Sequence, residues 1–232
     1  MHAFYHPTLS EGNNILSKEE SHHMLKVMRL KQGAEFILLN GEGKSAEATL
    51  TKADKNIAHC AVEKITIHEK KSPLINLFIA PPKSGDRLDL IVEKAPELGV
   101  NSIHFLMCRN SERKHLKVDK IQQKVIAACK QSLQAYFPAV HDFIDIHKME
   151  LQPDHSNLIF HCREDIVRTE IEKVKLHSTI NLFIGPEGDF AKEEIKMLLD
   201  KGGLSTSLSN SRLRTETAAL SAIIKSETLY FI

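Results

Sequence analysis

From Leu74 to the C-terminus, short apolar runs alternate with longer segments of helical pattern, and this alternation limits the possible folds more than any other feature. Buried strands that alternate with helices are typical of a parallel sheet with helices packed on it. The strands are expected at 74–80, 102–106, 157–161, 180–184 and 204–208. The helices are expected at about 85–98, 118–135, 165–175, 191–200 and 215–232. The sequence therefore predicts an α/β fold with a mainly parallel sheet.

The N-terminal part of the chain has a different pattern. Alternating or β-branched segments at 2–6, 36–40, 45–51 and 57–67 are separated by turn signals, which predicts a small β-rich domain. The capping-box sequence Ser17-Lys18-Glu19-Glu20 indicates one helix that runs toward Val27. The polar stretch 69–73 breaks any regular element. We therefore expect two domains, residues 1–72 and residues 73–232.

Two strand-to-helix turns near the C-terminus are the best candidates for a binding site. Gly185-Pro186-Glu187-Gly188 follows one expected strand, and Leu213-Arg214-Thr215-Glu216-Thr217-Ala218-Ala219 opens the last helix, with Thr215 as its expected N-cap. In open α/β sheets ligands lie beyond the carboxyl ends of strands, and glycine lets the backbone approach them closely. The two turns predict one crevice, although an ordinary capped helix also explains the second turn. Neither a dinucleotide fingerprint nor a P-loop occurs.

The charge of the chain is balanced, with 31 basic and 30 acidic residues. No global field therefore attracts the protein to a polyanion. Residues 83–130 nevertheless carry ten Lys or Arg against six Asp or Glu, so a nucleic-acid surface is expected to be local and to come mainly from this block.

Cysteine and histidine spacing argues against a metal site. The four cysteines form no C-x-x-C pair, and the thirteen histidines form no H-E-x-x-H or comparable ligand set. Free thiols and the lack of a secretory or membrane-length apolar run favour a cytoplasmic protein with no metal and no membrane partner.

The motifs together resemble one family. Gly185 to Gly188 and Leu208 to Ala218 look like the cofactor-binding end of SPOUT methyltransferases. His23-x-x-x-Val27-x-Arg29-x-x-x-Gly33 and the run from Glu93 to Val100 resemble the ribosomal RNA small subunit methyltransferase E family. Members of that family methylate N3 of a uridine in 16S rRNA of the small ribosomal subunit with S-adenosyl-L-methionine.

The resemblance implies a fold and an assembly. Residues 1–72 are expected to form a PUA-like or OB-like β-barrel that helps to hold RNA. Residues 73–232 are expected to form a SPOUT α/β-knot, a mainly parallel sheet with a deep trefoil knot. It also implies a homodimer whose site lies near the interface between the two copies.

The resemblance also assigns roles to individual residues. Two catalytic hypotheses stay open, Glu216 as general base or Arg214 as the group that stabilises a uracil anion, and a purely structural role for both is the alternative. The expected cofactor-binding residues are Phe160, His161, Ile184, Gly185, Pro186, Glu187, Gly188, Leu208, Ser209, Leu213, Arg214, Thr215, Thr217 and Ala218. The expected RNA-binding residues are Arg29, Lys31, Arg87, Lys94, Arg109, Arg113 and Lys114.

Several residues depart from the family pattern. Gln134 stands where relatives have arginine, Ser209 where they have glycine, and Ala191 where a capping Ser or Thr precedes the glutamate pair. Pro96 predicts a kink or an early end of its helix. Two other functions stay open. The nearest is a SPOUT enzyme that acts on another RNA or on a ribose 2'-hydroxyl, and the second is a non-catalytic RNA-binding assembly factor, which Ser209 and Gln134 favour.

Overall fold

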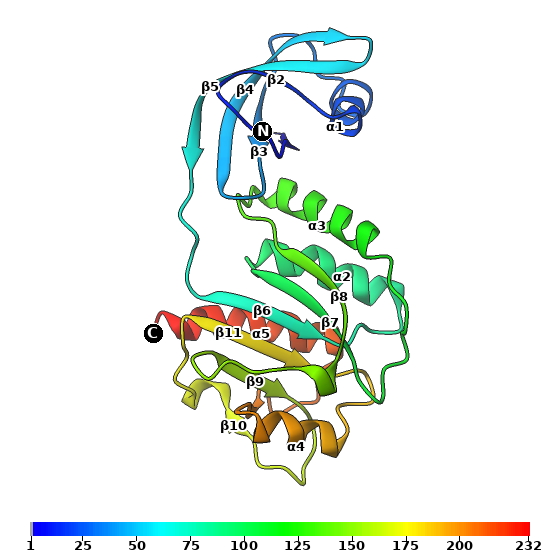
Figure 1. Cartoon of the computed structure of the whole chain (residues 1–232), viewed down its shortest axis with the longest axis vertical. Coiled ribbons are helices and arrows are strands. Elements are labelled where there is room, and N and C mark those ends of the chain that lie inside the picture. Colours follow the sequence, from blue (N-terminus) through cyan, green and yellow to red (C-terminus); the bar gives the residue numbers. More distant parts are fainter. Residues whose placement is uncertain (1) are drawn as a thin grey trace. The chain divides into compact units, whose positions relative to one another are not determined.

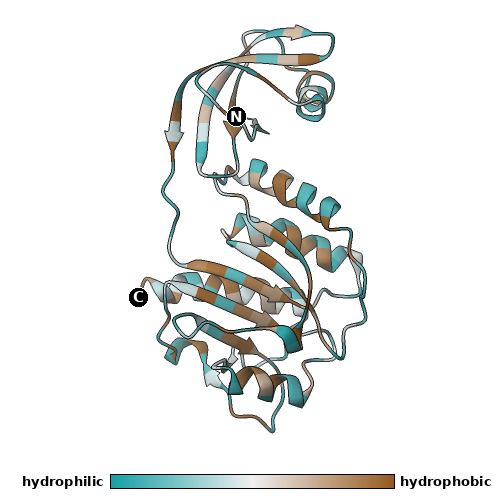
Figure 2. Ribbon diagram, viewed as in Figure 1, coloured by the Kyte–Doolittle hydropathy of each residue, from teal (hydrophilic) through white to brown (hydrophobic). Residues whose placement is uncertain are grey.

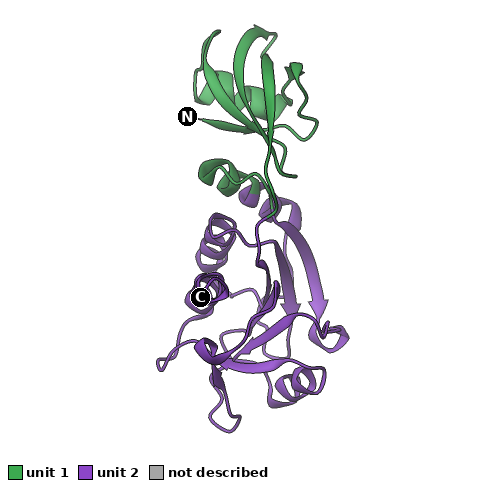
Figure 3. Cartoon of the chain, turned by 90° about the vertical axis from the view of Figure 1, so that its left-hand side faces the viewer, with its two compact units in different colours: residues 1–70, 126–137 green, residues 71–125, 138–232 purple. Residues whose placement is uncertain are grey.

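The computed structural model describes residues 2–232 and divides into two compact units (Figure 3). One unit consists of residues 1–70 and 126–137, and the other of residues 71–125 and 138–232. The first unit thus includes a segment that the sequence assigned to the second domain. This segment contains the C-terminal half of α3 (Val118–Ser132).

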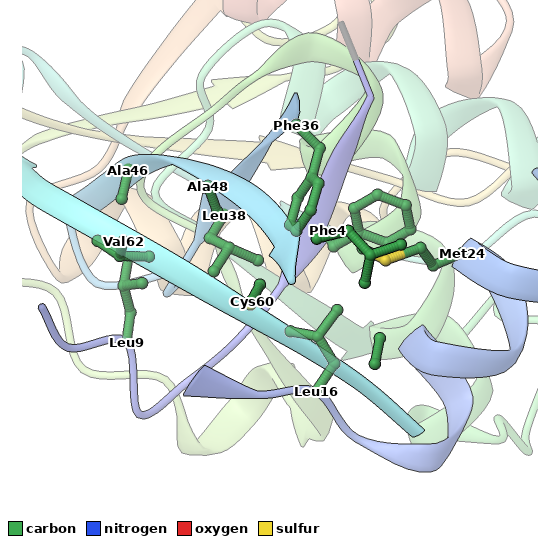
Figure 4. Packing of buried hydrophobic residues seen from close by; sticks show 12 residues of the cluster. Phe4, Leu9, Leu16, Met24, Phe36, Leu38, Ala46, Ala48, Cys60 and Val62 are labelled. Atoms are coloured by element: carbon green, nitrogen blue, oxygen red, sulfur yellow. The ribbon is translucent and has the colours of Figure 1, made fainter. Parts of the chain in front are cut away.

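The first unit is built on a five-stranded sheet in the order β1-β3-β4-β5-β2. Its strands are β1 (Ala3–Tyr5), β2 (Gly12–Ile15), β3 (Glu35–Leu39), β4 (Lys44–Asp54) and β5 (Ile57–Ile67). Figure 4 shows the core of this unit, where Phe4, Phe36, Leu38 and Met24 come together from different elements. β2 was not predicted, because its Gly-Asn-Asn-Ile sequence has no strand-like alternation.

The N-terminal helix of the first unit begins as the capping box predicts. The Ser17 hydroxyl accepts a hydrogen bond from the Glu20 N–H at 3.2 Å at the start of α1 (Lys18–His22). The helix then widens into a π-helical turn, η1 (His23–Val27). Two residues later Arg29 has a φ of +55°, in the left-handed region that side chains other than glycine rarely adopt. Such backbone strain is often associated with function.

The second unit is a seven-stranded sheet in the order β10-β12-β9-β11-β6-β7-β8, and every neighbouring pair is parallel. Its strands are β6 (Leu74–Ile79), β7 (Ser102–Met107), β8 (Ala139–Asp145), β9 (Ser156–Phe160), β10 (Thr169–Glu170), β11 (Thr179–Ile184) and β12 (Leu204–Ser207). Its central strands are largely hydrophobic (Figure 2). The mainly parallel α/β fold is therefore confirmed; the trefoil knot stays a prediction.

Helices cover both faces of this sheet (Figures 1 and 3). α5 (Thr215–Tyr230) packs on β6 and β11 and against α2 (Gly85–Glu97). α4 (Lys192–Asp200) packs on the other face, where Ile195 and Leu198 join the cluster that contains Phe78 and Phe183. This double cover explains why the central strands are hydrophobic on both sides.

Asparagine side chains connect the central strands near their amino ends. Asn181 Nδ2 donates to Asn157 Oδ1 at 2.8 Å, and Asn76 Nδ2 donates to Asn181 Oδ1 at 2.9 Å. The hydroxyl of Ser102 and the amide of Asn101 in turn donate to Asn76 Oδ1. Because buried amides must be paired, this ladder fixes the register of β9, β11, β6 and β7 at one level.

The helix expected at 165–175 is wrong. The chain there runs extended beside β12, with β10 followed by a short 3₁₀ turn, η3 (Ile171–Lys173). The Ser205 hydroxyl donates to the Val167 carbonyl at 2.8 Å, and Asp165 is bound by both Arg163 and Lys192. These tertiary contacts outweigh a helical pattern that was weak.

Two helix boundaries and one strand also differ from expectation. Arg214, not Thr215, is the N-cap of α5, since its backbone is extended and its carbonyl accepts the Ala218 N–H at 2.8 Å. α3 ends at Ser132, short of 135, because Leu133 turns into the left-handed region at φ +56°. β8 was not predicted, because none of the residues of this edge strand is fully buried and polar residues interrupt its apolar ones.

The end of α2 is as the sequence predicts. Pro96 lies in the last turn, and the helix ends one residue later. Gly99 follows with a φ of +74°, the conformation that favours glycine just past a helix end.

Candidate active site

A cavity of about 360 Å³ lies in the second unit, beyond the carboxyl ends of the neighbouring strands β12, β9 and β11. The loops that follow these strands form its walls, and the starts of α2 and α5 complete it. The lining residues are Arg87, Phe160, His161, Cys162, Arg168, Ile184, Gly185, Pro186, Glu187, Asp189, Thr206, Leu208, Ser209, Ser211, Arg212, Leu213, Arg214, Thr215 and Ala218. The two late turns of the sequence therefore meet in one pocket.

Of the expected cofactor-binding residues, all but Gly188 and Thr217 line this cavity. The expected cofactor-binding residues did not include six others that line the cavity: Cys162, which was expected only as part of a third wall of the crevice, and Arg168, Asp189, Thr206, Ser211 and Arg212. Most of these adjoin expected residues, so their positions next to the two turns were an available signal. Arg168 gave no such signal, because its segment was expected to be helical and solvated.

The turn after β11 is held by its own aspartate. Asp189 has a φ of +64°, and its carboxylate accepts the N–H groups of Phe190 and Cys162, each at 2.8 Å. It therefore ties the loop after β9 to the loop after β11. A Cβ on Gly185 would lie 3.1 Å from Phe190, so this glycine makes room for the fold as well as for any ligand.

A lysine on α5 fixes the loop between β12 and α5 by a hydrogen bond to its backbone. Lys225 Nζ on α5 donates to the Leu208 carbonyl at 2.9 Å and also pairs with Glu172. Ser209 does not occupy the left-handed region, so the serine in place of glycine causes no backbone strain. Its hydroxyl accepts the Ser211 N–H at 3.1 Å.

His161 presents an uncharged ring to the cavity. Burial is the main cause that lowers the pKa of its imidazole, with Arg168 and Arg163 adding to the effect and Asp189 opposing it. Ser205 donates its proton to Val167, so the 2.8 Å contact with Ser205 makes His161 Nε2 the donor. Nδ1 then accepts the Arg163 N–H at 3.3 Å, as the neutral Nε2–H tautomer requires.

The two expected catalytic residues differ in exposure. Arg214 is exposed and lines the cavity, and its guanidinium has no hydrogen-bond or ion-pair partner within residues 2–232. Glu216 is buried behind the lining, with Oε1 at 3.6 Å from Arg87 Nε. The structure thus brings Arg87, expected to bind RNA, to the same cavity as Arg214.

The loop after β7, residues 109–114, is hydrogen-bonded to the turn after β11, residues 185–189, which we call the glycine turn. Asn110 Nδ2 donates to the carbonyls of Gly188 and Asp189, and the buried Glu194 accepts the Arg109 and Ala191 N–H groups at 2.7 and 2.8 Å. Glu194 thereby partly replaces the missing cap at Ala191. The loop that carries the expected RNA contacts therefore adjoins the cavity.

The expected RNA-binding side chains in this unit are not equally free. The Arg113 guanidinium donates to the carbonyls of Pro82 and Lys83 at 2.8 and 2.6 Å, and Lys94 Nζ donates to Glu97 at 2.8 Å. Arg109 lies 3.6 Å from Glu193, with both side chains exposed. The Lys114 side chain is exposed and makes no ion pair within the described chain.

In the first unit, Arg29 and Lys31 are exposed just after the π-helical turn. Neither side chain has a partner among residues 2–232.

Residues 69–226 match the family described as an RNA methyltransferase domain, and residues 16–63 match an RNA methyltransferase PUA domain. Ribosomal RNA small subunit methyltransferase E of Neisseria gonorrhoeae, solved bound to S-adenosyl methionine, is 30% identical with a TM-score of 0.87 and covers 99% of this chain and 98% of that one. The chain belongs to the ribosomal RNA small subunit methyltransferase E family.

Two other relatives are similar to this chain over most of their length. The Bacillus subtilis member is 28% identical over 224 residues, which cover 90% of this chain and 87% of that protein. A probable rRNA-methyltransferase from Porphyromonas gingivalis is 31% identical, with a TM-score of 0.91 and coverage of 100% and 99%. The expected family and its PUA domain are confirmed.

Three further properties concern residues 2–232. None of the helices in that range is both long and apolar enough to cross a bilayer. The same range holds no group of three or more His, Cys, Asp or Glu side chains placed to bind a metal ion. All four cysteines are free; burial raises the pKa of Cys60 to about 11 and of Cys129 to about 12.

Proposed function

We propose that this protein methylates N3 of a uridine in 16S rRNA of the small ribosomal subunit, using S-adenosylmethionine, in the cytoplasm. The observation that carries the proposal is the meeting of the glycine turn and the Leu208–Ala218 run in one cavity. The Neisseria relative, solved with S-adenosyl methionine, supports the choice of cofactor because it is similar over the whole chain.

The cavity fits an adenosyl ligand in size and chemistry. Its volume of about 360 Å³ lies within the roughly 300–1,000 Å³ of small-molecule sites. Phe160, Ile184 and Leu213 offer apolar surface, and the backbone of the glycine turn and of Leu208 offers hydrogen-bonding groups. When bound, S-adenosylmethionine supplies an electrophilic methyl group.

Arg214 is the residue that we assign to the reacting base. The weakly acidic N3 first loses its proton to water, which leaves negative charge shared with the uracil oxygens. N3 then takes the methyl group as the methyl–sulfur bond breaks, and the base becomes neutral again. A free guanidinium at the cavity stabilises that charge by charge-assisted hydrogen bonds. Glu216 is less well placed as general base, because it is buried behind the lining and faces Arg87.

RNA is held by basic groups in both units. Arg109 and Lys114 lie on the loop that is hydrogen-bonded to the glycine turn, while Arg29 and Lys31 lie on the PUA unit. Phosphate contacts of this kind position the substrate and carry no sequence information themselves. Arg113 and Lys94 hold local structure in the free protein and are weaker candidates.

We also propose a homodimer. The C-terminal helix exposes Ile224 and then Phe231 at its end, with exposed fractions of 48% and 69%. Of the small residues near its start, Ala219 and Ala222 are buried in the chain's own core and Ala218 lines the cavity, so the exposed apolar side chains carry this proposal. Sedimentation at assay concentrations measures this directly, and a monomer that is fully active would overturn it.

The proposed function is tested by mass mapping of rRNA nucleosides from cells that lack this protein. We expect one uridine of 16S rRNA to lose its N3-methyl group, and purified protein with S-adenosylmethionine to restore it. A missing ribose 2'-O-methyl group, or a loss in another RNA, would replace this proposal with a different substrate. An unchanged set of nucleosides and no cofactor binding would favour a non-catalytic assembly factor.

A further inference from the structure

A carboxylate with an unfilled hydrogen-bonding capacity lies beside the cavity. Glu216, in the first turn of α5, is only 7% exposed. Its Oε1 faces Arg87, while its Oε2 receives no hydrogen bond from any residue of 2–232. Buried polar atoms are normally paired, so an unpaired oxygen next to a binding site needs a functional explanation.

The position of Arg87 is explained by Glu216 and not by its own helix. Arg87 lies in the first turn of α2, where the helix dipole disfavours a positive charge. Its side chain is 34% exposed and lines the cavity. The packing of α5 against α2 places the Glu216 carboxylate behind this guanidinium. The carboxylate therefore compensates for an unfavourable location and fixes the arginine at the cavity.

The geometry of the pair leaves the guanidinium available to a ligand. A separation of 3.6 Å between Nε and Oε1 is an ion pair without a hydrogen bond. The five N–H donors of a guanidinium are therefore not consumed by Glu216. Arg214 lines the same cavity but has no carboxylate partner among the described residues. The two arginines thus form one anchored and one free donor group.

We propose that Arg87 is a second arginine that contacts the reacting base, and that Glu216 is the positioning residue that holds it there. The inference rests on the proposed function. Arg87 donates to a uracil carbonyl oxygen as negative charge develops on the ring, alongside Arg214. Glu216 keeps the guanidinium directed into the cavity and does not receive the N3 proton.

The test is a double-mutant cycle in single-turnover assays on the full-length protein. The substrates are S-adenosylmethionine and unmodified small subunits from cells that lack the protein. Arg87→Ala should slow methyl transfer about 10²-fold, the usual cost of one donor to a developing anion. Glu216→Gln should slow it less, and the double variant should be no slower than Arg87→Ala, because Glu216 acts through Arg87. Losses that multiply in the double variant would overturn the proposal.

Chemical rescue provides a readout that a merely structural role would not change. Guanidinium ion, added below denaturing concentrations, should restore part of the rate of Arg87→Ala, because Glu216 still offers it a site. It should not restore the rate of the Arg87→Ala, Glu216→Gln double variant. Rescue that is absent from the single variant, or equal in both, contradicts the positioning role.

Controls separate this inference from folding and from the proposed function. Lys173→Ala breaks an exposed lysine–carboxylate pair with Glu170 of 2.9 Å outside the cavity lining and should leave the rate unchanged. If Arg87→Ala does not fold, as judged by circular dichroism, Arg87→Lys takes its place in the cycle. A wild-type protein that binds no S-adenosylmethionine or makes no methylated uridine refutes the proposed function. An active wild type with multiplying losses refutes only the role of Glu216.

Discussion

At the scale of single residues, the site combines groups that the surrounding protein holds with groups left free for a ligand. In both Asp189 and Glu194, each carboxylate oxygen accepts a hydrogen bond from a backbone N–H group of the surrounding loops. Arg214 and Arg212, in contrast, line the cavity without a partner in the described chain. Fixed loops and free guanidiniums are what a preorganised site for a developing anion requires.

Substitution of Arg214 should separate catalysis from cofactor binding. Arg214→Ala should lower the single-turnover methylation rate by about 10²- to 10³-fold, since one donor to the anion is lost. Arg214→Lys should recover part of the rate because the charge remains. Calorimetric titration with S-adenosylmethionine should give similar affinities for both variants. A large loss of cofactor affinity with a normal rate at saturation would instead make Arg214 a binding residue.

His104 should make the second unit sensitive to acid. Burial, and secondarily the stacked His141, lowers the pKa of His104 from 6.5 to about 4. An unfolded chain therefore binds a proton that the folded one does not, so stability falls as pH drops from 6.5 towards 4 and the effect is complete below it. The loss is at most about 3 kcal/mol, and less because the ring is partly exposed.

The variant His104→Phe checks the pH effect, because it keeps a stacked ring without the titrating group. Urea unfolding midpoints of the wild type should fall between pH 6.5 and 4 more steeply than those of the variant. His2→Phe, an exposed position in the first unit, is a control that should keep the wild-type dependence. Parallel curves for the wild type and His104→Phe would contradict the assignment.

At the scale of elements, the sequence predicts the strands that are buried in the sheet. It misses the elements whose structure depends on contacts with segments distant in the sequence. The apolar runs of β6, β9 and β11 identify central strands covered on both faces. No residue of the edge strand β8 is fully buried, so its sequence lacks the continuous apolar run of the central strands. β10 was taken for helix because its pairing with β12 is a tertiary contact. In the site, the same limit hid Arg168, which is placed by the His161 carbonyl.

The asparagine ladder should contribute measurably to the stability of the sheet. Asn181→Leu removes the hydrogen bonds to Asn157 and Asn76 and leaves the buried amide of Asn157 and the half-buried amide of Asn76 each short of a partner. We expect the free energy of unfolding of this unit to fall by about 2 kcal/mol. Asn13→Ala, an exposed asparagine of β2, should change it by less than about 0.5 kcal/mol. Equal midpoints for Asn181→Leu and wild type in denaturant titrations would remove the ladder as a source of stability.

At the scale of the whole molecule, a net charge of +1 cannot by itself hold rRNA. RNA binding must therefore come from local groups, and the two units offer separate ones. The first unit, which contains the PUA domain, has Arg29 and Lys31. The second unit, which contains the methyltransferase domain, has Arg109 and Lys114 on the loop beside the cavity. Each unit should then contribute its own share of phosphate contacts, whereas the chemistry belongs to the second unit alone.

Salt titrations of RNA binding test this division of roles. Lys31→Ala and Lys114→Ala should each reduce the slope of log affinity against log salt by about 0.7–0.9, since each removes one phosphate contact. Both variants should bind S-adenosylmethionine like the wild type, because neither lysine lines the cavity. Lys52→Ala, whose exposed side chain pairs with Asp54, is the matched control and should keep the wild-type slope. If Lys52→Ala lowers the slope as much as Lys31→Ala, RNA binding is diffuse. The PUA unit then provides only general positive charge, and the rRNA must be selected entirely at the cavity.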